Sequence, residues 1–352
     1  MTIYWLMFLV PVFFGFSIAR VDSDIEKIQW FLYGAILIII IGLRYKVGGD
    51  WENYIFNYSP LDGVFFKEAF LNNSDRVDYG FELLYWFFIN TPLGIYGVNL
   101  ASAIIFVAGL LRFCKSMPIP WLALAIATPY LVIVVSTGYT RQGITIGLFM
   151  WALVDLKDGK SAKFYLIIII GSLFHKSILL MALVGIFHST KSFSFYRLAG
   201  FIFIASVTIL IILIDRAENI YYYYFTNQYF SSSGAQIRVF MNVLAGIIFF
   251  YFKKKWALVY SDARLWTIIA LINFLLFPAS FWVSTFSDRI ALYLIPIQIA
   301  VYSKVPLLIS NIRTRTFMVI CVLSLYASSL FVWTNFGRHS VSWIPYRNIL
   351  FE

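Results

Sequence analysis

Long apolar runs, with the charged residues in short groups between them, restrict this 352-residue chain to very few folds. Many of the runs approach the roughly 20 residues that a helix needs to cross the hydrocarbon core of a bilayer. Hydrophobic residues make up 61% of the chain and charged residues 12%, whereas a soluble domain carries about a quarter charged residues. We therefore predict an integral membrane protein. The runs indicate helices, because a membrane barrel would show short alternating segments.

Hydropathy windows predict an all-α fold, a polytopic transmembrane helix bundle of about 10 to 12 membrane segments, some of them re-entrant or half-length. We expect residues 1–352 to form a single integral membrane domain. Two stretches do not fit a simple crossing: residues 81–89 are too few, and residues 164–187 are apolar on both sides of His175. The predicted spans lie near residues 3–19, 28–43, 95–113, 119–136, 139–156, 197–214, 237–252, 265–283, 289–303 and 316–333.

The basic residues indicate how the chain is oriented. They form short clusters between apolar runs, so membrane topology explains the net charge of +10 better than nucleic-acid binding does. All these clusters can be cytoplasmic only if residues 81–89 do not cross and residues 164–187 enter and leave on one side. A single helix through 164–187 is the alternative, and it would turn Lys253, Lys254 and Lys255 outward. The first arrangement predicts outward loops at 44–80, 137–141, 215–236, 284–288 and 334–352, with 44–80 and 215–236 as the main periplasmic elements.

Three arginines, Arg44, Arg141 and Arg289, would lie at the outer interface, where the positive-inside bias makes arginine unusual. An arginine close to hydrocarbon is unfavourable without a partner or a ligand, and a guanidinium suits two-pronged binding of a phosphate or diphosphate. Together the three predict an anion site on the outward face. The alternative for each is that it snorkels or pairs with a local acid, such as Asp288 beside Arg289.

A glycine pair follows the first of these arginines. Gly48 and Gly49 would allow the chain to turn, which would bring Asp50 back toward Arg44. Asp50 and Tyr54 are four residues apart and would share a helix face. An ordinary loop would explain the glycines equally well.

His175 lies within an apolar stretch, next to Lys176 and Ser177. Histidine is the side chain whose charge changes near neutral pH, so an intramembrane histidine is a candidate for proton transfer. The alternative is a structural hydrogen bond to a neighbouring helix.

Four segments, GLRYKVGGDWENY, YTRQGITIGLFMW, LFHKSILL and DRIALYLIP, occur in this order between residues 42 and 296. In order and spacing they resemble the EpsG family of bacterial polysaccharide polymerases, the Wzy-type O-antigen and capsule polymerases. The strongest matches are the pattern of Arg44, Gly48, Asp50 and Tyr54, and the run Arg141-Gln142-Gly143.

The resemblance implies a metal-independent membrane glycosyltransferase of the GT-C type in the bacterial inner membrane. It would polymerise undecaprenyl-diphosphate-linked oligosaccharide repeat units into O-antigen or capsular polysaccharide at the periplasmic face. Because this lipid donor carries its own activation, we expect no cofactor and no metal. The expected partners are the lipid-linked glycans and the bilayer, with a chain-length regulator protein as a further partner and no nucleic acid.

The resemblance and the charges together suggest roles for the site residues. Arg141 and Arg289 would stabilise the departing diphosphate, with Arg44 as a third clamp. Either His175 or Asp50 would take the proton from the acceptor hydroxyl. The other candidates would orient sugars and phosphate, namely Gly48, Tyr54, Tyr139, Gln142, Ser177, Asp288 and Tyr293.

Three other functions would use similar residues. A flippase for lipid-linked repeat units also needs outward cations, but carriers are commonly built from internal repeats, and the halves of this chain show no self-similarity. An O-antigen ligase uses nearly the same donor, and only the family resemblance favours the polymerase over it. A structural partner of a chain-length regulator would need no chemistry at all.

Overall fold

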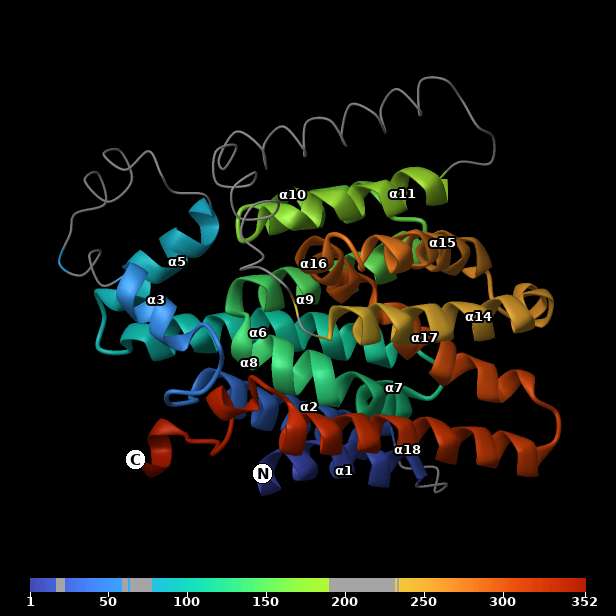
Figure 1. The fold of residues 1–352 in the computed structure, drawn as a ribbon, viewed down its shortest axis with the longest axis horizontal. Helices are drawn as coiled ribbons and strands as arrows, with labels where there is room; N and C mark the ends of the chain where they lie inside the picture. Colours follow the sequence, from blue (N-terminus) through green and yellow to red (C-terminus); the bar gives the residue numbers. More distant parts are fainter. Residues whose placement is uncertain (17–22, 59–62, 64–77, 190–231, 233) are drawn as a thin grey trace. The chain divides into compact units, whose positions relative to one another are not determined.

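A computed structural model describes residues 1–16, 23–58, 63, 78–189, 232 and 234–352, and the regular elements in these ranges are helices (Figure 1). Within them, extended backbone pairs only at an isolated antiparallel bridge between Arg44 and Asn348. The predicted all-α fold is therefore confirmed. The predicted span 197–214 and most of the predicted loop 215–236 lie outside the described residues.

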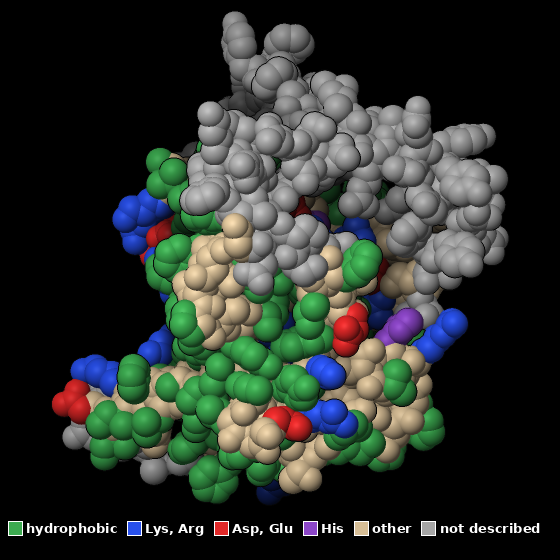
Figure 2. Space-filling view, turned by 90° about the vertical axis from the view of Figure 1, so that its left-hand side faces the viewer, with side chains coloured by type: hydrophobic (Ala, Val, Ile, Leu, Met, Phe, Trp, Pro, Cys, Tyr) green, Lys and Arg blue, Asp and Glu red, His purple; other side chains and the backbone are tan. Residues whose placement is uncertain are grey.

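Five helical stretches in the described part of the chain are long and apolar enough to cross a membrane: α2 (Ser23–Gly42), α6 (Gly94–Lys115), the stretch Pro120–Gly138, α14 (Ala235–Val259) and α18 (Ile312–Phe336). The bent pair Ser284–Leu294 and Pro296–Leu308 makes a sixth if it counts as one span. Phe31 on α2 and Leu258 on α14 are 74% and 87% exposed, and Figure 2 shows large areas of apolar side chains on one face. Lipid accommodates such surfaces, whereas water does not. The chain is thus a polytopic membrane helix bundle.

Several predicted segments are present as shorter apolar helices, which fall below the length of a full span. They are Thr2–Gly15, Ser161–Ser172, Lys176–His188 and Ala263–Ala279.

The described residues divide into two compact units. The first comprises Met1–Trp151, Leu173–His175 and Thr316–Glu352, and the second comprises Ala152–Ser172 and Lys176–Arg315. The single domain expected from sequence stays a prediction. Besides α2, α6 and most of α18, the first unit contains α1 (Thr2–Phe16), α3 (Trp51–Tyr58), α5 (Tyr79–Ile89), α7 (Pro120–Ala127), η2 (Thr128–Val135), α8 (Ser136–Gly138), most of α9 (Thr140–Lys157), η7 (Ser340–Ser342) and η8 (Ile349–Phe351).

The stretch from α7 to α8 forms the centre of the first unit. It is the most buried of the candidate spans, with 94% of its window inside the structure, and α1 and α6 pack against it. Its middle part, η2, is a π-helix that begins at Thr128-Pro129, where proline removes a backbone donor. The buried stretch ends at Gly138, and the break that follows places Arg141 in the first turn of α9.

Helices α6 and α9 approach each other closely in the same unit. A Cβ on Gly109 would lie 1.9 Å from the carbonyl oxygen of Gly147, and a Cβ on Gly147 would lie 2.6 Å from the Cα of Phe106. Small residues allow membrane helices to pack backbone against backbone in this way. This contact anchors the helix that carries Arg141.

In the second unit, α14 packs against α15 (Ala263–Ala279), α16 (Ser284–Leu294) and α17 (Pro296–Lys304), which η6 (Val305–Leu308) follows. The chain bends by 43° between α16 and α17. Asn242 of α14 donates to the carbonyl of Ala291 at 3.0 Å and accepts from Gln298 at 2.6 Å. These buried amides tie both sides of the bend to α14.

Residues 164–187 fold back on themselves rather than forming one helix. They are divided among α10 (Ser161–Ser172), η3 (Lys176–Met181) and α11 (Ala182–Ser189), and a Cβ on Gly185 would lie 2.5 Å from the ring of Phe164. The two ends of the stretch are therefore neighbours, which confirms the predicted pair of short helices meeting near His175. Which side of the membrane the hairpin enters stays a prediction.

Residues 81–89 belong to α5, which has only 11 residues. At 1.5 Å per residue this helix is about 16 Å long, roughly half the thickness of the hydrocarbon core. The prediction that this stretch does not cross agrees with its length.

Candidate functional site

Gly48 forms a tight turn after α2 with φ +111°, a conformation that favours glycine. Its N–H donates to the carbonyl of Ser342 at 2.8 Å, and the N–H of Asp50 donates to the carbonyl of Gly138 at 3.2 Å. A Cβ on Gly48 would lie 2.0 Å from the carbonyl oxygen of Thr137. The predicted turn is confirmed, and these two N–H groups hold it against the protein instead of facing a ligand.

Arg44 is buried, with 2% of its surface exposed. Its guanidinium donates to the carbonyls of Ile41 and Val47 at 2.6 and 3.1 Å, and to the side chains of Asn99 and Thr140 at 2.9 and 2.8 Å. Burial lowers its pKa to about 10, so Arg44 remains charged at neutral pH. Protein oxygens thus surround the group that the sequence suggested as a diphosphate clamp. We assign Arg44 instead to holding Thr140 and the start of α9.

Arg141 is placed differently. It lies in the first turn of α9 with 36% of its side chain exposed, and its Nη1 donates to Oδ2 of Asp78 at 2.8 Å. Its backbone N–H faces the Tyr54 hydroxyl at 3.4 Å, and its guanidinium carbon lies 5.9 Å from the centre of the Tyr54 ring. The start of a helix carries partial positive charge, which adds to that of the guanidinium. Arg141 therefore suits an anionic ligand that approaches from its exposed side.

His175 approaches the same oxygen of this carboxylate as Arg141 does. Its Nδ1 is 3.7 Å from Oδ2 of Asp78, and 22% of its side chain is exposed. The Gly80 N–H donates to the carbonyl of Leu173 at 2.7 Å, and a Cβ on Gly80 would lie 2.8 Å from the Leu173 Cβ. Glycine thus allows the tip of the hairpin to reach the start of α5. The structure brings His175 and Arg141, two predicted site residues, onto one carboxylate.

Asp78 is a residue that the sequence prediction missed. Its side chain is 4% exposed, and Oδ1 is buried with no hydrogen-bond partner among the described residues. Burial acts to raise its pKa, but the interactions with His175 and Arg141 outweigh that effect and hold the pKa below its usual value. A buried acceptor without a partner costs about 1–3 kcal/mol, so this oxygen needs an explanation. An acid directly before a short aromatic helix, at the end of a predicted outward loop, was the available signal.

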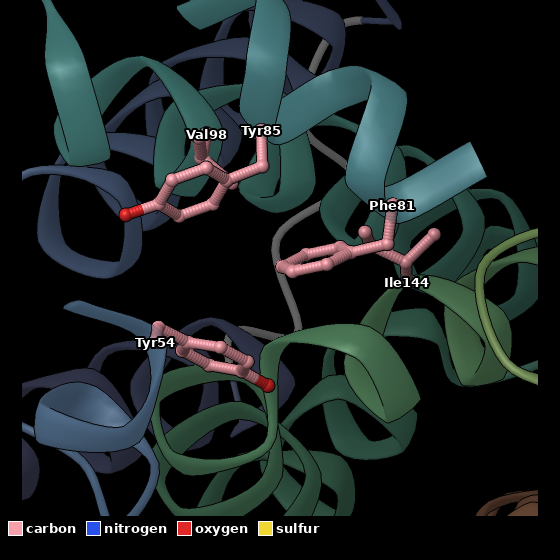
Figure 3. Close-up of a cluster of buried hydrophobic side chains, with 5 residues drawn as sticks. All are labelled: Tyr54, Phe81, Tyr85, Val98 and Ile144. Carbon is pink, nitrogen blue, oxygen red and sulfur yellow. The ribbon is translucent and has the colours of Figure 1, made fainter. Parts of the chain in front are cut away.

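Tyr54 connects the Gly48 turn to Arg141, because its hydroxyl contacts both Asp50 and the backbone N–H of Arg141. Its ring packs in the aromatic cluster with Phe81 and Tyr85 (Figure 3), while its hydroxyl donates to Oδ2 of Asp50 at 3.3 Å. The contact confirms that Asp50 and Tyr54 share a helix face. Burial raises the pKa of Tyr54, so the hydroxyl stays protonated and able to donate. The negative charge of Asp50 also raises the pKa of Arg44, against the effect of burial. This agrees with the prediction that the turn at Gly48 brings Asp50 back toward Arg44.

The C-terminal segment packs against the residues just before α9. The sequence did not indicate this contact. Trp343 is 1% exposed, and its Nε1 donates to the Thr137 hydroxyl at 2.7 Å. A Cβ on Gly138 would lie 2.0 Å from the Trp343 ring, and Tyr139 packs against that ring with centroids 6.2 Å apart. Tyr139 is half-buried and Gln142 is 7% exposed. That they contact sugars stays a prediction.

In the second unit, Asp288 forms a two-pronged ion pair with Arg238, not with its neighbour Arg289. The pair joins Oδ1 and Oδ2 of Asp288 to Nε and Nη2 of Arg238 at 2.6 and 2.7 Å, and the Ser232 hydroxyl donates to Oδ2 at 2.8 Å. Arg289 itself is exposed on α16. Arg238 stands at the start of a predicted span, so the reasoning that selected the other arginines could also have found it.

Ser177 and Tyr293 also belong to the second unit, where their hydroxyl oxygens lie 3.0 Å apart. Tyr293 is fully buried and Ser177 is half-buried. Their predicted role in orienting sugars stays a prediction. Across the described residues, His, Cys, Asp and Glu side chains form no group of three that could hold a metal ion.

Comparison with protein families places this site in a known context. The model of the EpsG family matches residues 27–348, which is most of the chain and contains Asp78, Arg141 and His175. The chain belongs to the EpsG family. EpsG is a family of Wzy-like polysaccharide polymerases, which implies glycosyltransferase-like chemistry for this membrane helix bundle. No curated protein and no solved structure matches the chain.

Proposed function

We propose that this EpsG protein extends a glycan carried on undecaprenyl diphosphate at the periplasmic face of the bacterial inner membrane. It transfers the growing chain to a sugar hydroxyl of the next lipid-linked repeat unit, and the product is O-antigen or capsular polysaccharide. The observation that carries the proposal is the partly exposed side chain of Arg141, at the start of α9 and beside a buried carboxylate, in a member of a polymerase family. The lipid-linked glycans, the bilayer and a chain-length regulator are the proposed partners.

The reaction needs help at two points. The acceptor oxygen forms a bond to the anomeric carbon, the bond from that carbon to the diphosphate oxygen breaks, and the electron pair leaves with the diphosphate. Arg141 stabilises the charge that grows on this leaving group, and a cation fixed in place is more effective in the transition state than in the ground state. A base must also remove the proton of the acceptor hydroxyl. Because the leaving group carries the activation, we propose that the reaction needs no metal and no cofactor.

His175 suits the role of base better than Asp50 does. It reaches the carboxylate that binds Arg141, so proton removal and leaving-group stabilisation would take place close together. Asp50 is half-buried, and its Oδ2 already accepts a hydrogen bond from the Tyr54 hydroxyl. We therefore assign the base to His175 and keep Asp50 as the second candidate.

The glycan made by cells that lack their own polymerase tests the proposal. Wild-type protein is expected to restore long chains. Cells without polymerase activity carry one repeat unit on the acceptor core, whereas a flippase defect leaves no repeat unit outside and a ligase defect leaves polymer on the carrier lipid. Either of the last two patterns on deletion of this gene would contradict the proposed function.

Arg289→Ala tests the predicted second cation in the same cells. We expect at least about a tenfold loss of long chains, because one charged contact to a developing anion contributes a few kcal/mol. Arg338→Ala is the matched control, since Arg338 is also exposed but lies in the C-terminal segment. Membrane levels are compared by immunoblot. If Arg141→Ala and Arg289→Ala both gave wild-type chains at normal expression, the assignment of the site would be wrong.

A further inference from the structure

The proposed chemistry does not yet use the buried carboxylate of Asp78. Its Oδ2 lies 2.8 Å from Nη1 of Arg141 and 3.7 Å from Nδ1 of His175. Its Oδ1 is equally buried and accepts no hydrogen bond from the described residues. A carboxylate with one oxygen shared and the other unoccupied is suited to a ligand that donates a hydrogen bond.

We propose that Asp78 is the positioning residue of the polymerase site: Oδ2 orients His175 and Arg141, and Oδ1 accepts a hydrogen bond from a hydroxyl of the acceptor sugar. The inference rests on the proposed function and adds where the acceptor binds. It also explains why the hairpin tip is held to the start of α5 by the bond from Gly80 to Leu173.

The geometry determines what each group does in the transfer. In this proposal Nδ1 of His175, which lies 3.7 Å from Oδ2, carries the proton that faces Asp78, and Nε2 is the basic nitrogen. The acceptor O–H bond breaks as its oxygen bonds to the anomeric carbon, and the proton moves to Nε2. The imidazolium that forms is stabilised by the adjacent carboxylate, as in other sites where an acid orients a histidine. The electron pair of the broken glycosidic bond leaves with the diphosphate, whose charge Arg141 faces.

A purely structural role for Asp78 would have a different consequence. An ion pair that only joins α5 to α9 would affect folding, and the rate of each folded molecule would not depend on the carboxylate charge. Asp78→Asn keeps the shape and one oxygen acceptor but removes that charge, so it separates the two possibilities.

The test uses full-length protein in lipid vesicles with lipid-linked repeat units as donor and acceptor, and kcat is expressed per folded molecule. We expect Asp78→Asn to lower kcat by about 100-fold, the range typical of losing assisted proton transfer. Asp78→Glu keeps the charge, so its kcat should be at least about tenfold higher than that of Asp78→Asn. Glu52→Gln is the control, because it makes the same chemical change at an exposed residue of α3 and should leave kcat unchanged.

Asp78→Asn that kept kcat within about threefold of wild type would overturn the inference. The inference would also be overturned if Asp78→Asn and Asp78→Glu both folded and were equally inactive. The carboxylate charge alone would then not account for the role of Asp78. If Asp78→Asn does not fold, the activity of Asp78→Glu decides: substantial kcat supports the inference, and none contradicts it. Failure of the proposed function itself is distinguishable, because wild-type protein would then join no repeat units.

Discussion

Arg141→Ala is expected to reduce polymerisation by about 100-fold or more, which is the effect of removing one preorganised charge contact from a developing anion. Arg141 lies at the start of α9 with 36% of its side chain exposed, and its Nη1 donates to Asp78. We expect the exposed part of the side chain to meet the ligand while the ion pair stays intact. Because the lost interaction is stronger in the transition state, the change should appear mainly in kcat and less in KM.

Arg141→Lys separates charge from geometry. Lysine keeps a positive charge beside the buried Asp78, so the fold should be retained, but it cannot bind a diphosphate in two-pronged fashion. We expect an activity between those of wild type and Arg141→Ala, measured with lipid-linked repeat units in vesicles. The exposed Arg338→Ala again serves as control. Full activity of folded Arg141→Ala would show that the leaving group is stabilised elsewhere.

Local sequence patterns predicted the parts of the site that depend on neighbouring residues. The turn at Gly48, the shared face of Asp50 and Tyr54, and the hairpin near His175 each follow from spacing, hydropathy or charge over a few residues. The all-α membrane fold follows in the same way from the length of the apolar runs. These features require no knowledge of which distant segments meet.

The features that were missed depend on contacts between distant segments. Asp78 matters because the hairpin tip and α9 both reach it, 97 and 63 residues along the chain. Arg44 was expected to face a ligand, but Asn99 and Thr140 occupy its guanidinium. Trp343 reaches Thr137 across 206 residues. Charge and hydropathy identify such residues as unusual, but they do not show which partner each one has.

Gly48→Ala is expected to disrupt the site although Gly48 is not proposed to touch substrate. A residue with a side chain is strained at φ +111°, at a cost of about 1–3 kcal/mol, and its Cβ would also lie 2.0 Å from the Thr137 carbonyl oxygen. That oxygen belongs to backbone in the most buried helical stretch, so it cannot easily move aside. We expect a loss of at least about 3 kcal/mol in stability and a fall in unfolding temperature of roughly 5 °C or more in detergent.

The neighbouring glycine provides the control for this prediction. Gly49 does not adopt a positive φ, and a Cβ there would lie 3.2 Å from one edge of the Trp343 ring, so Gly49→Ala should change stability by less than about 1 kcal/mol. Because the turn bonds to both Gly138 and Ser342, its displacement would also move the start of α9 and with it Arg141. Gly48→Ala should therefore lower the polymerisation rate of the molecules that remain folded, whereas Gly49→Ala should not. Equal stability and equal rates for the two variants would mean that the turn does not position Arg141.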